Sequence, residues 1–295
     1  MLPALKTGDC IGVMAPSSYV ERADIERAQA LIEGHGYKSF IHPQTYERNH
    51  QSAGTGAQKA EAFHELWARN DIHAVWAAGG GNRCLPLLEL INFDQLKVTP
   101  KPFVGFSDAT ALLNGIYAHT GIPTIHGPVL SKLHKHKQIA SLIRMLEGKD
   151  TSIPLDQAQV INAGRAEGVM VGGNLSLFQY LPQTLPTPFW KNAILFLEDC
   201  NEELSRIDRM LYHLKRLDVF KDISGLVFGQ FTSPKESGRP FGFSLEDIIK
   251  EHAEGLSIPI VMNAPFGHGE DLYPIQIGTR MTFDTHKGFL KLNKI

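Results

Sequence analysis

Ser107 lies between an apolar, strand-like segment and a helix-like segment. The surrounding residues, Gly105 to Ala109 (GFSDA), join the run KPFVGF to the run ATALLNGIYAH. A serine on such a tight strand-to-helix turn is raised above the edge of a sheet, where the helix N-terminus also supplies free N–H groups. The amide of Asp108 would then point at an oxyanion formed by attack of the serine hydroxyl. From these residues alone, a nucleophilic role for Ser107 competes with a plain helix cap made by Ser107 and Asp108.

Three consecutive glycines could supply a second donor to an oxyanion. Gly79, Gly80 and Gly81 directly follow the apolar segment 72–78. Glycine lets a backbone N–H approach a reacting atom with no side chain in between. The alternatives are an ordinary turn at the end of a strand, or a phosphate-binding loop, although the GxGxxG and GxxxxGK[ST] spacings do not occur here.

An acid and a histidine in the second half of the chain could complete a catalytic triad. Glu198 ends the apolar run AILFLE, and His268 lies between two glycines in PFGHGE. In such places an acid is commonly a solvated strand end, and a histidine is commonly a surface residue. In a Ser-His-acid triad, by contrast, the histidine accepts the serine proton while the acid orients and stabilises the imidazole.

The order of Ser107, Glu198 and His268 resembles that of the LD-carboxypeptidase family, serine peptidases that trim murein peptides and include microcin-immunity peptidases. GFSD at 105–108 is similar to the family's G-[YF]-S-D nucleophile motif, and PFGH at 265–268 resembles its histidine loop. Further similar segments are the N-terminal strand and turn at 8–18, HGP at 126–128, GGNL at 172–175, LED at 197–199 and RIDRML at 206–211. The resemblance therefore covers nearly the whole chain.

The resemblance implies a Ser107 nucleophile, a His268 base oriented by Glu198, and oxyanion donors at Asp108 and at Gly80 or Gly79. It implies hydrolysis of an LD-peptide bond that releases terminal D-alanine from murein tetrapeptides during cell-wall recycling, with no metal or organic cofactor. A related peptidase that cleaves a microcin-like aminoacyl-nucleotide would use the same residues. A non-catalytic ligand-binding protein on the same scaffold is a third interpretation.

Substrate preference is left open by one departure from the family pattern. The family usually has Arg-Gly-Gly-Tyr-Gly where this chain has AAGGGNR at 77–83. A carboxypeptidase must bind a free carboxylate, for which arginine is well suited. The candidate substrate-binding residues are Arg83, Asn174, Arg206 and Arg209.

The segments that must position these residues alternate between strand and helix in the first half. Apolar runs at 10–15, 72–78 and 102–106 predict strands, and helical spacing appears at 22–34, 59–69 and 109–119. This alternation predicts a parallel α/β sheet with helices on both faces, and ligands bind at the carboxyl ends of such strands. The resemblance implies a flavodoxin-like, amidotransferase-like N-terminal domain followed by a smaller, β-rich α+β swivelling domain.

Residues 1–150 are expected to form the N-terminal domain, 151–163 a linker and 164–295 the C-terminal domain. In the second half, short strands at 193–197 and 225–228 flank a helix at 205–217. Because Ser107 falls in the first domain and Glu198 and His268 in the second, a triad requires an active site where the two domains meet.

The composition argues against several other classes of protein. Hydrophobic residues make up 43% and the net charge is −2, so no basic field favours nucleic acid or an anionic membrane, despite the short run KLHKHK at 132–137. Three widely spaced cysteines without a CxxC pair, no HExxH pair and no membrane-length apolar segment predict reduced thiols, no metal site and a cytoplasmic protein. The resemblance adds a homodimer with a muropeptide as its substrate.

Overall fold

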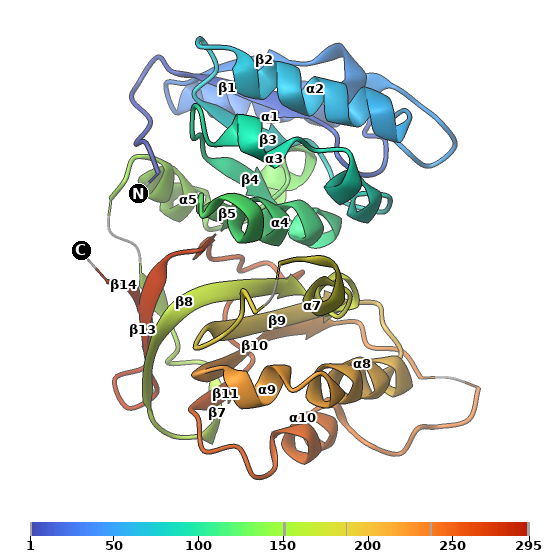
Figure 1. Ribbon diagram of the computed structural model, residues 1–295, viewed down its shortest axis with the longest axis vertical. Helices are drawn as coiled ribbons and strands as arrows, with labels where there is room; N and C mark the ends of the chain where they lie inside the picture. The colour runs from blue at the N-terminus through green and yellow to red at the C-terminus, as the bar shows by residue number, and fades with distance from the viewer. Residues whose placement is uncertain (1, 150–151, 187, 237, 294–295) are drawn as a thin grey trace. The chain divides into compact units, whose positions relative to one another are not determined.

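The computed structural model describes residues 2–149, 152–186, 188–236 and 238–293, and its chain divides into two units (Figure 1). The N-terminal unit comprises residues 1–150 and 274–278, and the C-terminal unit comprises residues 151–273 and 279–295. The small segment 274–278 carries β12 (Ile275–Ile277), which pairs antiparallel with β5 (Thr124–His126) of the N-terminal unit. Residues 164–295 were expected to form one domain; the structure differs because a strand of three residues has no periodicity that shows which sheet it joins.

The N-terminal unit is built on a six-stranded sheet with the strand order β12-β5-β4-β3-β1-β2. Its parallel strands are β1 (Cys10–Met14), β2 (Lys38–Ile41), β3 (Ala74–Ala77), β4 (Phe103–Gly105) and β5. The order 2-1-3-4-5 is that of flavodoxin-like folds, as predicted, and it puts the switch point between β1 and β3. The turns at 16–18, 79–82 and 105–108 follow the carboxyl ends of β1, β3 and β4, where ligands of such sheets bind.

Helices cover both faces of this sheet, because successive side chains of a strand point to opposite faces. Ile11 and Val13 pack in one core cluster with Ile25 of α1 (Arg22–Gly34) and Leu142 of α5 (Ile139–Leu146). A Cβ atom at Gly12 would contact Leu66, which places α2 (Gly56–Ala68) on the other face. The remaining elements are η1 (Pro43–Tyr46), η2 (Leu85–Glu89), α3 (Phe93–Leu96), η3 (Ser107–Ala109), α4 (Thr110–Thr120) and η4 (Leu130–Lys135).

The C-terminal unit is built on an eight-stranded sheet with the order β6-β14-β13-β8-β9-β10-β11-β7. Its parallel centre consists of β8 (Arg165–Asn174), β9 (Ile194–Cys200), β10 (Gly225–Thr232) and β11 (Ile260–Met262). Antiparallel strands flank it: β13 (Arg280–Asp284), β14 (Phe289–Leu292), β6 (Ser152–Pro154) and β7 (Gln159–Asn162). The segment expected to be a linker thus carries β6 and β7, which are short edge strands without a visible alternation.

The helices of this unit are amphipathic. In α8 (Leu204–Arg216), the buried residues recur every three or four positions, as a helix that packs by one face requires: Leu204, Ile207, Met210, Leu211 and Leu214. This helix packs against α10 (Leu245–Ala253), which begins at a capping box made by Ser244 and Asp247. Shorter helices are α6 (Leu175–Phe178), α7 (Leu181–Thr184) and α9 (Val219–Asp222); Figure 1 shows α8, α9 and α10 gathered beside β10.

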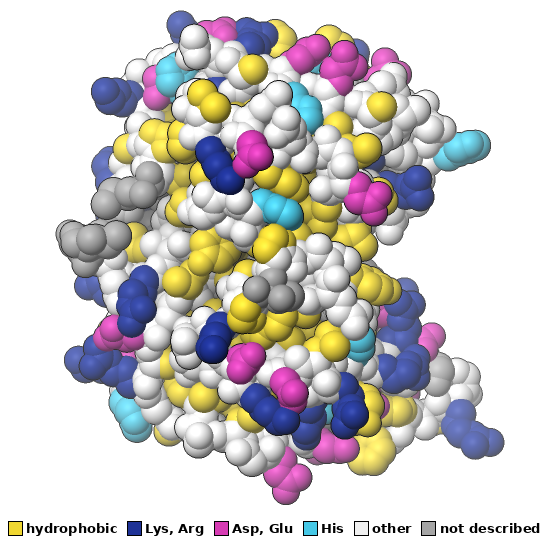
Figure 2. All heavy atoms as spheres, viewed as in Figure 1, with side chains coloured by type: hydrophobic (Ala, Val, Ile, Leu, Met, Phe, Trp, Pro, Cys, Tyr) yellow, Lys and Arg dark blue, Asp and Glu magenta, His cyan; other side chains and the backbone are white. Residues whose placement is uncertain are grey.

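The surface is of mixed charge. On the face seen in Figure 2, basic and acidic side chains are interspersed among polar and small apolar patches. Within the described ranges, none of the helices is both long and apolar enough to cross a bilayer. The three cysteines are unpaired thiols; Cys84 is buried, whereas Cys10 and Cys200 are partly exposed.

Candidate active site

Ser107 lies on a strained turn between β4 and α4. Its φ is +59°, a left-handed conformation that a serine adopts at an energetic cost, and it begins the short helix η3. Such strain persists only where the surrounding structure imposes it, and it is the hallmark of a nucleophile held on a strand-to-helix elbow. The local geometry therefore favours the nucleophile interpretation of Ser107 over a plain helix cap, because the N-cap position of η3 belongs to Phe106 and Ser107 itself has the left-handed conformation.

The residue after the nucleophile anchors this elbow to the loop after β3, which carries Gly79, Gly80 and Gly81 and is called the glycine loop below. Asp108 is only 4% exposed, and its carboxylate accepts a hydrogen bond of 2.9 Å from the amide of Cys84. Burial raises the pKa of the Asp108 carboxyl, and the nearby Ser17 side chain and the hydrogen bond from the Cys84 amide oppose that shift. The Asp108 side chain thus has a structural role, while its backbone amide remains the candidate oxyanion donor.

Gly80 is the glycine that lies against the nucleophile. A Cβ atom built on Gly80 would be 3.2 Å from the Cβ and 3.5 Å from the Oγ of Ser107, whereas one on Gly79 would meet Val20 at 2.6 Å. The loop is held by Ser18, whose amide donates to the Gly80 carbonyl and whose hydroxyl accepts from the Asn82 amide. The turns after β1, β3 and β4 therefore meet, and of the two candidate glycines Gly80 is the better placed.

Replacing Gly80 with alanine is expected to lower kcat by about 10²- to 10³-fold, which is the typical cost of one lost oxyanion donor. The added methyl group would crowd Ser107 and push the Gly80 amide away from the oxyanion. Steady-state kinetics would measure the loss. The control is Gly34→Ala at the end of α1, where an added methyl group meets nothing within 4 Å and full activity should remain. Equal activity of the two variants would remove Gly80 from the oxyanion hole.

Glu198 and His268 form a close pair in the C-terminal unit. Glu198 lies in β9 and is fully buried, and its Oε2 is 2.6 Å from Nδ1 of His268, whose side chain is 19% exposed. The histidine loop reaches this position through Gly267, which has a φ of +116° and where a Cβ would lie 2.7 Å from the Gln230 carbonyl. The two glycines around His268, which the sequence showed, are therefore needed for close packing of the loop on β10.

The charge of the pair changes the basicity of the imidazole. Burial is the largest single effect and lowers the pKa of His268, but the charge of the Glu198 carboxylate and the interactions with Cys200 and Glu198 together outweigh it. The pKa of His268 is therefore raised above its ordinary value of 6.5. Cys200 contacts His268, as the alternation along β9 from Glu198 predicts.

A second buried acid supports the strand that carries Glu198. The Asp199 carboxylate accepts hydrogen bonds of 2.9 Å from the Asn174 side-chain amide and from the Ser176 backbone amide. Burial and the neighbouring Glu198 raise the pKa of Asp199. Asn174 stands beside Glu198 in the β8–β9 register. The structure thus gives Asn174, predicted as a substrate-binding residue, a direct contact with Asp199.

The two arginines predicted from the second half lie on the exposed side of α8. The Arg206 guanidinium pairs with Glu202 at 3.0 Å, and its side chain is 55% exposed. Arg209 is also exposed. Arg83, in contrast, lines a polar pocket of the N-terminal unit beside the glycine loop.

Comparison with known proteins shows the family of the chain. Residues 11–127 match the model of the LD-carboxypeptidase N-terminal domain, and residues 167–283 match that of the LD-carboxypeptidase C-terminal domain. The chain belongs to the LD-carboxypeptidase family.

Its relatives include proteins named as murein peptide carboxypeptidases and a protein named for immunity to a microcin. The chain is 31% identical over 276 residues to a murein tetrapeptide carboxypeptidase of Pseudomonas aeruginosa, covering 88% of each chain. It is 26% identical over 325 residues to the microcin C7 self-immunity protein MccF of Escherichia coli, covering 95% of this chain and 92% of the relative. The crystal structure of a muramoyltetrapeptide carboxypeptidase from Oxalobacter formigenes superposes with a TM-score of 0.86 at 26% identity, over 97% of this chain and 99% of that one.

Lys59 is a residue of this LD-carboxypeptidase family member that the sequence motifs do not point to. The residue is 1% exposed and lies on the apolar face of α2, with Phe63 and Leu66 at helical spacing. A lysine in the buried stripe of an amphipathic helix was the available signal, since lysine is almost never fully buried without a partner. The role of Asp199 is not visible in the sequence either, because its partners Asn174 and Ser176 come from another strand and another helix.

Proposed function

We propose that this protein is a serine-type LD-carboxypeptidase that uses Ser107, His268 and Glu198 as its catalytic triad. The observation that carries the proposal is the Glu198–His268 pair: a fully buried carboxylate 2.6 Å from a histidine nitrogen orients an imidazole as a general base requires. The strained elbow at Ser107 and the membership of the family support it. That His268 and Ser107 meet during catalysis is part of the proposal.

In the proposed reaction, Ser107 attacks the scissile carbonyl while Nε2 of His268 accepts the hydroxyl proton, because Nδ1 faces Glu198. The amides of Asp108 and Gly80 would stabilise the oxyanion of the tetrahedral intermediate. His268 then gives its proton to the leaving amine, and water hydrolyses the acyl-enzyme by the same steps in reverse. Glu198 holds the tautomer and stabilises the imidazolium throughout.

The substrate that we propose is a murein tetrapeptide, from which the enzyme would release terminal D-alanine in the cytoplasm during peptidoglycan recycling. The names of the relatives from Pseudomonas aeruginosa and Oxalobacter formigenes support this substrate class. We include a homodimer in the proposal, on the resemblance to the family; sedimentation or light scattering of the purified chain tests it.

Incubation with murein tetrapeptide, followed by mass spectrometry, tests the proposal. We expect free D-alanine and the corresponding tripeptide, and we expect the same products after exhaustive treatment with EDTA, because every group in the mechanism is an amino-acid side chain or a backbone amide. Intact peptide after long incubation would contradict the proposed substrate. Loss of activity on chelation, with recovery on adding zinc, would contradict the serine mechanism.

A second candidate function uses the same residues. The similarity to a microcin C7 self-immunity protein, over 95% of this chain, favours a peptidase that cleaves an aminoacyl-nucleotide conjugate. The same mass-spectrometric assay with such a conjugate separates the two functions, since cleavage of the conjugate alone would support the second.

A further inference from the structure

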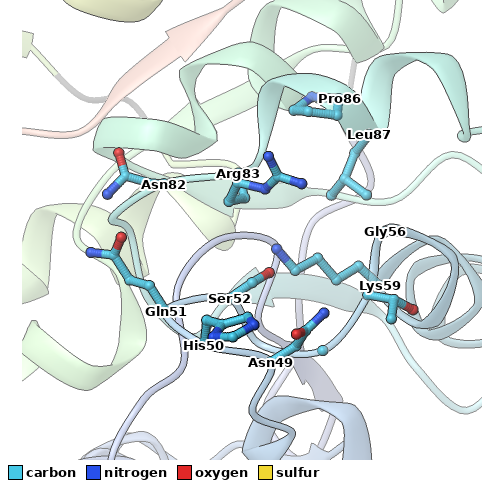
Figure 3. Close-up of a pocket in the computed structure, with 12 residues that line it drawn as sticks. Asn49, His50, Gln51, Ser52, Gly56, Lys59, Asn82, Arg83, Pro86 and Leu87 are labelled. Carbon is cyan, nitrogen blue, oxygen red and sulfur yellow. The ribbon is translucent and has the colours of Figure 1, made fainter.

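A polar pocket lies beside the glycine loop of the N-terminal unit. It has a volume of about 420 Å³ and is lined by residues 49–52 and 54–56, by Lys59 of α2, and by the segment Asn82, Arg83, Pro86 and Leu87 (Figure 3). The pocket lies between the loop after β2 and the loop after β3, and the loop after β3 borders the switch point between β1 and β3, where such folds bind ligands. The position and size of the pocket suit one end of a small peptide.

Lys59 is the unusual group in this pocket. The residue is only 1% exposed, yet among the described residues its ammonium makes no hydrogen bond and no ion pair. Figure 3 shows the side chain extending across the pocket, so that the ammonium lies between Arg83 and the loop 49–52. Burying an ammonium without a partner is costly, and burial accordingly lowers the pKa of Lys59. An anion in the pocket would supply the missing partner.

The other lining residues provide cations and hydrogen-bond donors rather than acids. Arg83 is exposed and lines the same space, and the side chains of Asn49, Gln51 and Asn82 add amide donors. None of the described lining residues is an aspartate or glutamate. The acid that interacts with Lys59 from outside the pocket is Asp108, whose carboxylate is already bonded to the Cys84 amide.

The pocket and the nucleophile share one loop. Gly80 lies against Ser107, Asn82 and Arg83 follow in the pocket wall, and Cys84 then donates its amide to Asp108. In a carboxypeptidase substrate the terminal carboxylate is one residue beyond the scissile carbonyl, about 4 Å along the chain. A cationic pocket next to the elbow is therefore in the right place to bind the terminal carboxylate while Ser107 attacks the scissile carbonyl.

We propose that this pocket binds the terminal carboxylate of the substrate peptide, with Lys59 as the buried cation and Arg83 as the exposed one. The inference rests on the proposed peptidase function and names the substrate group that the enzyme requires. A purely structural lysine, placed only to balance Asp108, would be needed for stability but would not distinguish a carboxylate from a neutral group.

The test compares two tetrapeptides, one ending in D-alanine and one in D-alanine amide. Wild-type enzyme should favour the free carboxylate by about 10- to 100-fold in kcat/KM, the usual range for a hydrogen bond to a charged group. Lys59→Met, which keeps the length of the side chain, should remove most of that preference, and Lys59→Arg should restore part of it. Arg83→Asn removes the second charge and retains a residue that tolerates the φ of +83°, and it should reduce the preference further.

The matched control is Lys101, another buried lysine of the same unit, whose ammonium donates to the Leu66 and Arg69 carbonyls. Lys101→Met should lower stability and leave the carboxylate preference unchanged. If Lys59→Met and Arg83→Asn both keep the wild-type preference, the pocket proposal is wrong while the peptidase function stands.

A binding measurement separates failure of the pocket proposal from failure of the proposed function. In a Ser107→Ala background, calorimetry with the same two peptides should show tighter binding of the carboxylate form, and Lys59→Met should abolish the difference. If the wild-type enzyme hydrolyses neither peptide but this difference is observed, the peptidase function fails and the pocket proposal holds. Equal binding of the two peptides to the Ser107→Ala protein would overturn the pocket proposal.

Discussion

Replacing Ser107 with alanine should lower kcat by roughly 10⁴- to 10⁶-fold, the range found when the nucleophile of a serine peptidase triad is removed. Only one oxygen atom is lost, so the fold should survive. Serine and alanine both carry a Cβ atom, so the substitution leaves the backbone strain at the φ of +59° about the same. Single-turnover kinetics with murein tetrapeptide would measure the change, and circular dichroism would verify the fold.

The control for this variant is a serine of the same sheet that is distant from the elbow. Ser39 of β2 accepts a hydrogen bond from Gln29 on the edge of the N-terminal unit, and Ser39→Ala should retain wild-type turnover. A Ser107→Ala protein with a tenth of wild-type activity would remove Ser107 from the mechanism, and the ligand-binding interpretation of the scaffold would gain support.

Replacing Glu198 with glutamine should lower kcat/KM by about 10³- to 10⁴-fold and should shift its pH dependence. In the wild type, the neutral imidazole is the base, and its pKa is raised above 6.5. Activity should therefore increase with pH through that raised value. Glutamine removes the carboxylate charge while burial remains, so the pKa of His268 should fall and the rising limb should move to lower pH.

A profile of kcat/KM from acidic to alkaline pH would measure both effects. The matched control is Asp208→Asn in α8, because Asp208 forms a second close His–acid contact among the described residues of this unit, 2.8 Å from Nε2 of His252. That variant should keep the wild-type limb and rate. A Glu198→Gln enzyme whose limb stays at the wild-type pH would show that Glu198 does not set the basicity of the catalytic histidine.

Pattern and turn chemistry are sufficient to predict three central strands of the N-terminal sheet. The segments 10–15, 72–78 and 102–106 were predicted as strands and became β1, β3 and β4, because buried parallel strands are apolar throughout. The C-terminal sheet was foreseen only in outline. β8, ten residues long, has the polar residues Arg165 and Glu167 on its exposed end and three glycines, so its sequence lacks both the alternation and the apolar run of a typical strand.

For this protein, the sequence by itself determined the local features: a serine on a strand-to-helix turn, an acid ending a buried strand and a histidine between glycines. These depend on a few consecutive residues, so turn chemistry and periodicity are enough to specify them. The tertiary structure decided which groups come together: it places Glu198 beside His268 across 70 positions, Gly80 rather than Gly79 against Ser107, and Lys59 with Arg83 in one polar pocket. Such contacts depend on strand order and on how loops pack at the ends of strands, and neither leaves a signal in the spacing of residues along one chain.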